Sequence, residues 1–390
     1  MQPIPLGIPP KLPPKRAPLH AAAPLTITRV EAIPLKLPLT KTVAMSGVRV
    51  THGETLLVRV EAAGGTVGWG EASSAPTMTG DTLAGMTSVV RQTLIPLLEH
   101  QDALQRAALV RRCTQALRDN FSAVAAIDMA LLDLLGRHFG LPVCELLGGA
   151  LRTQMQTMGI LGGKTVAEDI SEAQDKYRKG YRFFKLKAGV KPIADDIRLA
   201  LELRAALGPA VKLCADANMG LAFDAAREFV TAVAGADWFF LEQPFAKHEL
   251  ARAADLARLS PVAIGADEGI GSAADIVAHQ RAGAAAGIAL KTIKLGGVAA
   301  TVRAAHVCEA LGLAVNLSSK MAESSVGAAG LLHIGAVLAE TAWGVCPSNH
   351  YLSDDIVKAP IAAVDGMLTL PAGPGLGVEV DEAAVARYRA

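Results

Sequence analysis

Charged residues recur at the ends of short apolar segments in the second half of this 390-residue chain. They are Lys185, Lys187, Asp216, Glu242, Asp267 and Lys291. Successive segments lie about 25 residues apart, the combined length of one strand and one helix. This repeat is typical of a barrel of parallel strands, in which the C-terminal ends of all strands meet at one mouth. We therefore expect these side chains to converge there.

Short apolar strands alternate with alanine-rich helices from residue 151 to about residue 360. We predict strands near 157–161, 183–187, 211–216, 238–242, 262–267, 287–291, 313–317 and 342–346. The alternation predicts a parallel sheet with right-handed crossovers, which eight strands would close. The expected fold class is α/β, a (β/α)7β TIM-like barrel with an α+β capping domain before it.

Three other segments flank the predicted barrel. Residues 1–24 are rich in proline, which forbids helix and denies donors to a sheet, so we expect a flexible tail. Residues 25–150 contain strand-like segments followed by amphipathic helices, the pattern of an α+β domain. Residues 361–390 break the repeat, and we expect them to return to that first domain.

Composition excludes several classes of function. The formal net charge of +1 gives no electrostatic reason to expect a nucleic acid or an anionic membrane as partner. The sequence has no uncharged apolar run of about 20 residues, so we expect no membrane span. Its five cysteines are scattered without a CxxC pair, which predicts reduced thiols and a cytoplasmic location.

Three of the recurring charged residues are carboxylates, namely Asp216, Glu242 and Asp267. Hard divalent cations such as Mg²⁺ and Mn²⁺ prefer oxygen ligands, and a few carboxylates leave coordination positions for water and substrate. Salt bridges at the barrel mouth are the alternative, but buried carboxylates without such a role are costly. We therefore predict a Mg²⁺ or Mn²⁺ site.

The lysines of the repeat supply candidate bases. Lys185 and Lys187 are two residues apart, so on a strand they point to the same face, and their repulsion is expected to lower at least one pKa. Lys291 comes four strands after Lys187, from the other side of the ring. Such a set suits proton abstraction next to a carboxylate. For Lys294 we expect an ion-paired or solvated side chain instead.

Several motifs in order resemble the enolase superfamily, in particular its muconate lactonizing enzyme subgroup within the mandelate racemase/muconate lactonizing enzyme family. In the first domain they are GWGEA at 68–72 and AAIDMALLDLLGRHFGLPVCELLGG at 125–149. In the barrel they are FFKLKAG at 183–189, CADANMG at 214–220, FLEQP at 240–244, GADEGI at 265–270, IALKTIKLGG at 288–297 and KMAESSVG at 320–327.

The resemblance implies roles for individual residues. Asp216, Glu242 and Asp267 match the family's metal ligands, Lys187 and Lys291 its acid/base lysines, and Lys185 a lysine near the substrate carboxylate. Further matches are Asn218 and Glu268, which would orient the metal carboxylates, and Glu323, an acidic residue bordering the active site. A mobile loop at about 40–53 would close over the substrate, with Met45, Ser46 and Arg49 as candidate contacts. The resemblance also implies a homo-oligomer.

The substrate is expected to be a small carboxylate. The segment TAWGVCPSNHYLSDDIV near the eighth strand resembles muconate cycloisomerases, whereas APTMTGDT at 75–82 resembles dipeptide epimerases. Those epimerases carry an Asp-x-Asp pair where this chain has Val345-Cys346-Pro347, which argues against a dipeptide substrate. A muconate-type cycloisomerase is therefore our first hypothesis.

Two other hypotheses remain open from the sequence. One is a racemase or epimerase of N-acyl amino acids, dipeptides or proline betaines, or a hydroxyproline dehydratase, because the same lysines serve these reactions. The other is a binding or scaffold protein without catalysis. Against the latter, the chain retains every candidate metal ligand and both lysines of its KxK motif.

Overall fold

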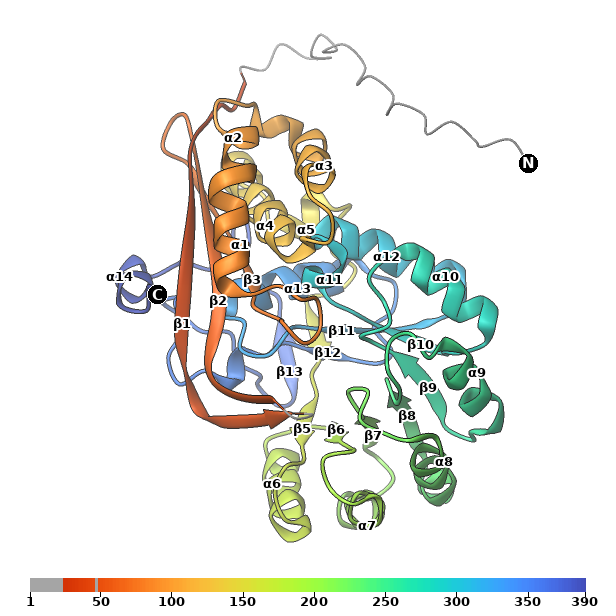
Figure 1. Cartoon of the computed structure of the whole chain (residues 1–390). Helices are drawn as coiled ribbons and strands as arrows, with labels where there is room; N and C mark the ends of the chain where they lie inside the picture. Colours follow the sequence, from red (N-terminus) through yellow and green to blue (C-terminus); the bar gives the residue numbers. More distant parts are fainter. Residues whose placement is uncertain (1–23, 46–47) are drawn as a thin grey trace, which may run out of the picture.

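The computed structural model describes residues 24–45 and 48–390, which form an α+β N-terminal part and a barrel of parallel strands (Figure 1). The N-terminal part opens with an antiparallel sheet of β1 (Ile27–Met45), β2 (Val48–Ala62) and β3 (Val67–Ser73). Its helical segments are α1 (Leu83–Val89), η1 (Val90–Leu94), α2 (Ile95–Leu98), η2 (Ala103–Gln105), α3 (Arg106–Ala116), α4 (Phe121–Phe139) and α5 (Val143–Leu146).

Helix α4 is the centre of the N-terminal part. Its residues from Ser122 to Gly136 are all buried, and the helix ends at Gly140 in the left-handed region with φ of 70°. A helix that is apolar on nearly every side must be covered all round. The sheet covers one side through β3, and helices of both parts cover the others. This places α4 between the sheet and the barrel and ties the two parts together.

Eight parallel strands follow one another around the barrel in chain order. They are β5 (Gly159–Leu161), β6 (Phe183–Lys187), β7 (Lys212–Asp216), β8 (Trp238–Glu242), β9 (Ala263–Ala266), β10 (Gly287–Leu290), β11 (Ala314–Ser318) and β12 (Val345–Cys346). A parallel bridge between Thr157 and Val345 joins β12 to the segment before β5 and closes the ring. Each strand overlaps the segment predicted for it, and the predicted fold class is confirmed.

Helices connect the barrel strands on the outside (Figure 1). They are α6 (Val166–Arg178), α7 (Ile193–Leu207), α8 (Phe223–Ala232), η3 (Ala234–Ala236), α9 (Leu250–Leu259), α10 (Ala273–Ala282), α11 (Thr292–Leu295), α12 (Val298–Ala310) and α13 (Ser325–Val337). Local sequence fixes several of their ends. Thr165 and Glu168, for example, form a reciprocal capping box at the start of α6, which satisfies backbone donors that the helix leaves unpaired.

Aromatic side chains fill the lower barrel interior beneath the strand ends that carry charge. Trp343 stacks on Phe240 with ring centroids 3.9 Å apart and packs in one cluster with Phe183, Met158 and Cys214. Gly287 leaves room for this indole, since a Cβ there would lie 2.6 Å from ring carbons of Trp343. The barrel is therefore closed from below, and its polar layer opens only toward the C-terminal ends of the strands.

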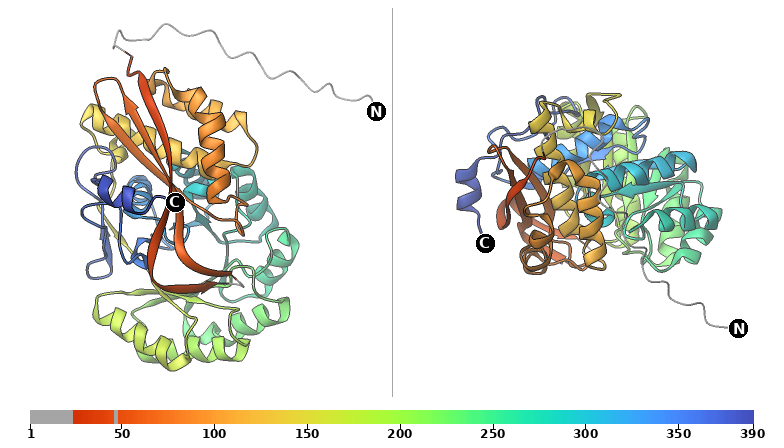
Figure 2. Two further views of the ribbon diagram at one scale, coloured as in Figure 1. Left: turned by 60° about the vertical axis from the view of Figure 1, so that its left-hand side comes forward. Right: turned by 90° about the horizontal axis from the view of Figure 1, so that it is seen from above.

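The C-terminal segment passes from the barrel to the N-terminal part (Figure 2). Strand β13 (Met367–Thr369) pairs with β4 (Gln154–Gln156), and after η4 (Asn349–Tyr351) and β13 the chain ends with α14 (Glu382–Arg387). The backbone N–H of Val143 donates to the carbonyl of Gly375 at 2.8 Å, and that of Ala390 donates to the carbonyl of Pro34 at 2.9 Å. This segment therefore fastens α5 and β1 to the rest of the chain.

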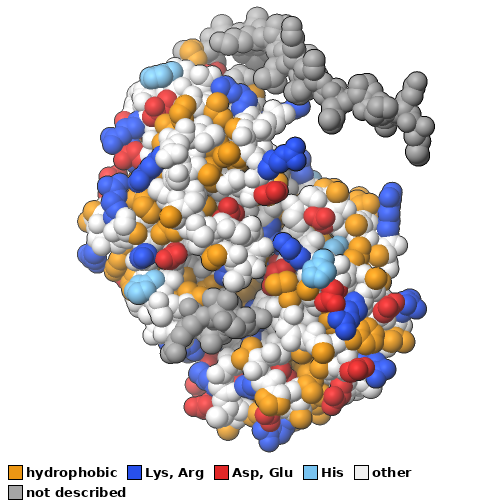
Figure 3. Space-filling model, in the orientation of Figure 1, with side chains coloured by type: hydrophobic (Ala, Val, Ile, Leu, Met, Phe, Trp, Pro, Cys, Tyr) orange, Lys and Arg blue, Asp and Glu red, His pale blue; other side chains and the backbone are white. Residues whose placement is uncertain are grey.

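The visible surface in Figure 3 carries acidic and basic side chains interspersed, without a large area of one sign. This agrees with the formal net charge of +1. Among the helices that the structure describes, none has the length and apolar character needed to span a bilayer.

Candidate active site

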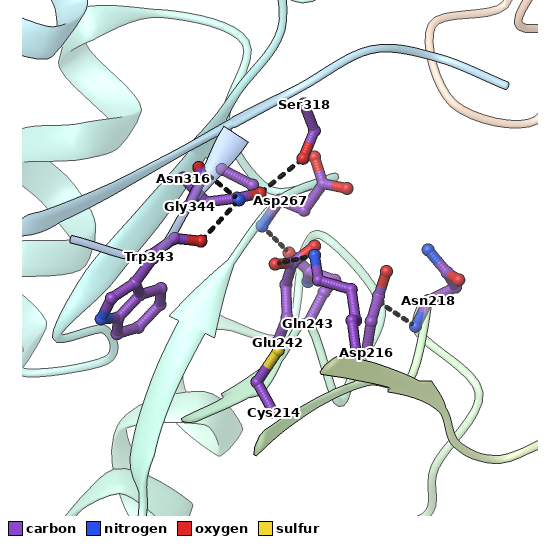
Figure 4. Close-up of polar contacts among 12 residues, drawn as sticks. Cys214, Asp216, Asn218, Glu242, Gln243, Asp267, Asn316, Ser318, Trp343 and Gly344 are labelled. Carbon is purple, nitrogen blue, oxygen red and sulfur yellow. Dashed lines mark hydrogen bonds and ion pairs between the residues drawn. The ribbon is translucent and has the colours of Figure 1, made fainter. Parts of the chain in front are cut away.

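Three carboxylates lie side by side at the C-terminal ends of neighbouring strands (Figure 4). Asp216 ends β7, Glu242 ends β8, and Asp267 directly follows β9. In the sheet register Asp216 pairs with both Lys187 on one side and Glu242 on the other, so these side chains occupy one layer. All three carboxylates are buried, each with at most 3% exposure. The regular spacing of these carboxylates along the sequence therefore places them in one compact acidic layer.

Each carboxylate is bonded to a lysine. Lys187 Nζ donates to Asp216 Oδ2 at 2.7 Å and to Asn218 Oδ1 at 2.8 Å, and Lys185 Nζ donates to Glu242 Oε2 at 2.8 Å. Asp267 accepts from two lysines. Lys291 Nζ bonds one of its oxygens, and Lys294 Nζ lies 2.7 Å from Oδ1. Lys294 is therefore ion-paired, as expected for that residue.

These ion pairs control the protonation of the lysines. Burial alone would lower the pKa of Lys185, but Glu242 and Asp216 outweigh it and hold that pKa well above its usual value. At Lys187, burial and repulsion by Lys185 lower the pKa, but the negative charge of Asp216 outweighs both. The pKa of Lys187 is therefore raised. The expectation that repulsion between Lys185 and Lys187 lowers the pKa of at least one of them is therefore wrong. The carboxylates of β7 and β8 raise the pKa values of these lysines more than the repulsion between the two lysines lowers them.

Two further side chains hold the acidic layer in place. Asn218 donates its backbone N–H to Asp216 Oδ1 at 3.0 Å and its amide Nδ2 to Glu268 Oε1 at 3.1 Å. Gln243 Oε1 accepts from the backbone N–H of Asp267 at 2.8 Å and of Gly269 at 3.1 Å. Sequence reasoning predicted Asn218 and Glu268 but missed Gln243. Its position directly after Glu242 in FLEQP was the available signal.

Glu323 does not line the pocket above the carboxylates. Its buried carboxyl accepts from Ser73 Oγ at 3.1 Å and from the backbone N–H of Lys320 at 3.1 Å, so it lies between the two parts of the chain. Burial and the nearby Glu71 raise its pKa to about 7. The structure therefore places Glu323 behind the loop after β11, where it supports pocket residues by bonding their backbone.

A pocket of about 160 Å³ opens above the acidic layer. Its lining includes seven of the predicted site residues, which are Lys185, Lys187, Asp216, Asn218, Glu242, Glu268 and Lys291. It also includes residues that the sequence analysis did not predict as site residues, which are Thr77, Met78, Ile160, Met219, Ser318, Ser319, Lys320, Met321, Cys346, Pro347, Ser348 and Tyr351. Most of these residues lie near the end of a barrel strand or within a few residues after it, so the rule that located Asp267 could have found them.

The predicted lid at about 40–53 is a paired hairpin for most of its length. Backbone pairing of β1 with β2 continues to Met45 opposite Val48, after an irregularity between Pro38 and Val43. Thr40 Oγ1 donates to the carbonyl of Tyr351 at 3.2 Å, which ties the hairpin to the segment after β12. Ser46 lies outside the described residues, as do the side chains of Met45 and Arg49, so their predicted contacts stay predictions.

The buried carboxylates at the barrel mouth are suitable ligands for a divalent cation, because such cations prefer oxygen donors. Within residues 24–45 and 48–390, no three His, Cys, Asp or Glu side chains are already arranged around one point, because each carboxylate faces a lysine. At this mouth, the buried Glu268 Oε2 has no hydrogen-bond partner among the described residues. Members of the enolase superfamily, which the sequence resembles, bind a divalent metal ion. Asp216, Glu242 and Asp267 could hold one by exchanging ammonium partners for the cation.

Comparisons with known proteins agree with this geometry. Residues 26–148 match the family model of the mandelate racemase/muconate lactonizing enzyme N-terminal domain, and residues 168–384 match the enolase C-terminal domain-like model. A chloromuconate cycloisomerase of Pseudomonas putida is 31% identical over 90% of this chain and 97% of its own length. An L-Ala-D/L-Glu epimerase of Bacillus subtilis is 29% identical over 91% of this chain and 97% of its own.

A solved structure extends the likeness to three dimensions. The muconate lactonizing enzyme of Pseudomonas fluorescens, complexed with muconolactone, superposes with a TM-score of 0.89 at 30% identity and covers 94% of this chain and 100% of its own. The two family models together match most of this chain, and the chain aligns with nearly the full length of both relatives. The chain belongs to the mandelate racemase/muconate lactonizing enzyme family of the enolase superfamily.

Proposed function

We propose that this protein is a divalent-metal-dependent cycloisomerase of muconate type, acting on a small unsaturated carboxylate. The observation that carries the proposal is the placement of Lys187 and Lys291 in one pocket beside three buried carboxylates. Their strands, β6 and β10, are four apart in a ring of eight, so the two amines approach a bound ligand from opposite sides. The cycloisomerase relatives and the superposed structure support the same reaction class.

The proposed chemistry needs one proton transfer next to a carboxylate. In cycloisomerisation, one carboxylate oxygen of the substrate forms a C–O bond to an alkene carbon, and the displaced electron pair moves to the other carboxylate as an enediolate. The ammonium of Lys187 then delivers a proton to the α-carbon, and the reverse reaction returns it to the amine. Asp216, Glu242 and Asp267 would hold Mg²⁺ or Mn²⁺, which would supply positive charge next to the substrate carboxylate.

Other residues position these groups. Asn218 and Asp216 both accept hydrogen bonds from Lys187 Nζ, at 2.8 Å and 2.7 Å, so the amine is aimed before a ligand arrives. Preorganisation of this kind reduces the entropy that must be lost on the way to the transition state. Lys185, bonded to Glu242, would lie near the substrate carboxylate and add to the positive field.

An epimerase or racemase of amino-acid derivatives is the second candidate. It is favoured by the two lysines on opposite sides of one pocket, because inversion of a carbon centre needs a base on each face. The Bacillus subtilis epimerase relative points the same way. Against a dipeptide substrate, Cys346 and Pro347 line the pocket near the eighth strand, where such epimerases carry an Asp-x-Asp pair. A neutral thiol and a proline offer no charge for an α-ammonium group.

Proton NMR in D₂O tests the proposal against its alternatives. The protein would be assayed with Mg²⁺ or Mn²⁺ and cis,cis-muconate, N-succinyl amino acids, dipeptides, proline betaines and hydroxyprolines. Lactone formed from muconate is the expected result. Deuterium entering the α-carbon of an amino-acid derivative, without lactone, would replace the proposal with an epimerase or racemase. Loss of water from a hydroxyproline would identify a dehydratase.

A homo-oligomeric state and a cytoplasmic location stay predictions.

A further inference from the structure

Lys320 differs from the other lysines that line the pocket. Lys185, Lys187 and Lys291 each bond a carboxylate, whereas Lys320 Nζ has no hydrogen bond or ion pair with any residue in the described part of the chain. Its side chain is partly buried, and it follows β11 by two residues. Among the described residues, Lys320 is therefore a pocket cation without a directly bonded counter-ion.

The backbone around Lys320 is held on several sides. The N–H of Lys320 donates to Glu323 Oε1 at 3.1 Å, and its carbonyl accepts from Ser348 Oγ, which also accepts from the N–H of Glu323 at 3.1 Å. Ala322 has a φ of +63°, a conformation costly for a residue with a Cβ. Such a conformation persists only where surrounding contacts determine it, so Lys320 stands on a rigid base.

The hairpin of the N-terminal part presses on the same loop. A Cβ built at Gly53 of β2 would lie 2.8 Å from Ala322 Cβ and 2.9 Å from its carbonyl oxygen, so only glycine permits this approach. Ser73 of β3 bonds Glu323 from the same side. Strands β2 and β3 of the N-terminal part thus hold this barrel loop in one conformation. A lysine that was only solvated would not need its loop to be held in this way.

The electrostatic surroundings of Lys320 favour an anion. Burial, together with Lys291 and Lys187, lowers its pKa to about 8, so the unliganded site disfavours its charge. A nearby anion would raise the pKa of Lys320 again and favour its charged form. The adjacent Ser319 also lines the pocket, but its buried hydroxyl lies beside the carboxyl of Glu323. The ammonium of Lys320 is therefore the group at this wall that would bind an anion.

Lys320 lies further around the barrel mouth than the candidate metal carboxylates. These carboxylates end β7 and β8 and follow β9, whereas Lys320 follows β11, which is four, three and two strands away from those strands. A ligand that extends from the acidic layer toward β11 would therefore meet Lys320 at its other end. A monocarboxylate would leave this cation unpaired.

We propose that Lys320 binds a second anionic group of the substrate, so that the site selects small dicarboxylates over monocarboxylates of the same length. The inference rests on the proposed function in one respect, that the first carboxylate is bound at the acidic layer. It goes beyond that function by assigning the residue that recognises the other end of the substrate.

Calorimetric titration of the Mg²⁺-loaded protein with two unreactive probes tests the assignment. Adipate has two carboxylates on a six-carbon chain, and hexanoate has one on a chain of the same length. The unsubstituted protein should bind adipate at least about tenfold more tightly, the contribution of one hydrogen bond to a charged group. Lys320→Met should remove this preference while leaving hexanoate affinity unchanged, and Lys320→Arg should retain most of it.

Lys358→Met is the matched control, since Lys358 is a surface lysine paired with Glu379 and does not line the pocket. Equal affinity of the unsubstituted protein for both probes would overturn the assignment, as would an unchanged preference in Lys320→Met. So would equal weakening of both probes, which would indicate that the lysine only supports the loop. Absence of lactone from muconate, with the adipate preference still dependent on Lys320, would reject the cycloisomerase and leave this assignment standing.

Discussion

Glu71, near the end of β3, caps the first turn of helix α13 in the barrel through Ser324. The backbone N–H of Ser324 donates to Glu71 Oε1 at 2.9 Å, and the Ser324 hydroxyl bonds Oε2. Gly327 N–H donates to Oε2 at 2.9 Å, and Thr55 Oγ1 donates to Oε1 at 2.8 Å. A carboxylate at a helix N-terminus satisfies free donors and interacts favourably with the helix dipole. One side chain thereby joins the two parts of the chain.

Replacing Glu71 with Gln should destabilise the folded protein by about 2–3 kcal/mol, because an amide nitrogen would face buried N–H donors that need an acceptor. The measurement is the free energy of unfolding from urea titration at pH 7. Glu379→Gln is the control, since that carboxylate is exposed and only ion-paired at the surface. Equal stability of the two variants would contradict a structural role for the Glu71 cap.

Divalent cations should raise the melting temperature through Asp216, Glu242 and Asp267. At a concentration one hundred times the dissociation constant, the added stability is about 2.7 kcal/mol. Asp216→Asn should lose most of this shift in a thermal melt with Mg²⁺ or Mn²⁺ against excess chelator. Asp224→Asn, at an exposed position in α8, should keep it. A full shift in Asp216→Asn would remove that residue from the proposed metal site.

Lys187→Met should lower the rate of proton transfer by a factor of roughly 10²–10⁴, the usual contribution of a general acid/base. The metal-dependent melting shift should remain, because the carboxylates stay in place. The rate is measured as lactone formation or as deuterium exchange, whichever the substrate panel reveals. Lys179→Met, an exposed substitution outside the pocket, serves as control. Activity that survives Lys187→Met intact would rule out its proposed role.

Acid should destabilise the protein partly through His333 in α13. Its Nδ1 accepts the backbone N–H of Cys144 at 3.2 Å, which fixes the neutral tautomer, and burial lowers the pKa to about 4. The unfolded chain, with a histidine pKa near 6.5, binds more protons between pH 6.5 and 4. Stability contributed by this group is therefore present above about pH 6.5 and is lost as pH falls toward 4, by about 3 kcal/mol in total.

Urea titrations at pH 7 and pH 5 measure this dependence. His333→Gln should be less stable than the unsubstituted protein at pH 7, and the difference should narrow at pH 5 because glutamine does not titrate. His248→Asn, at an exposed position, provides the comparison. A difference that stays constant between the two pH values would show that His333 does not titrate in this window.

The sequence determined the barrel and the composition of its acidic layer. Asp216, Glu242 and Asp267 were predictable because strand and helix lengths impose a local period, and parallel strands of one barrel must end on one side. Lys187 and Lys291 could be placed on opposite sides of the ring for the same reason. These inferences need only distances along the chain, which the sequence contains.

The tertiary structure decided which charges meet. The pKa of Lys185 is raised, contrary to the prediction, because Glu242 two strands away bonds it, and no local pattern reports that contact. Glu323 lies behind the pocket and Lys320 lines it, because β2, β3 and Ser348 hold their loop in one conformation. Loop conformation depends on contacts between residues far apart in the chain, whereas strand order and strand ends follow from local periodicity.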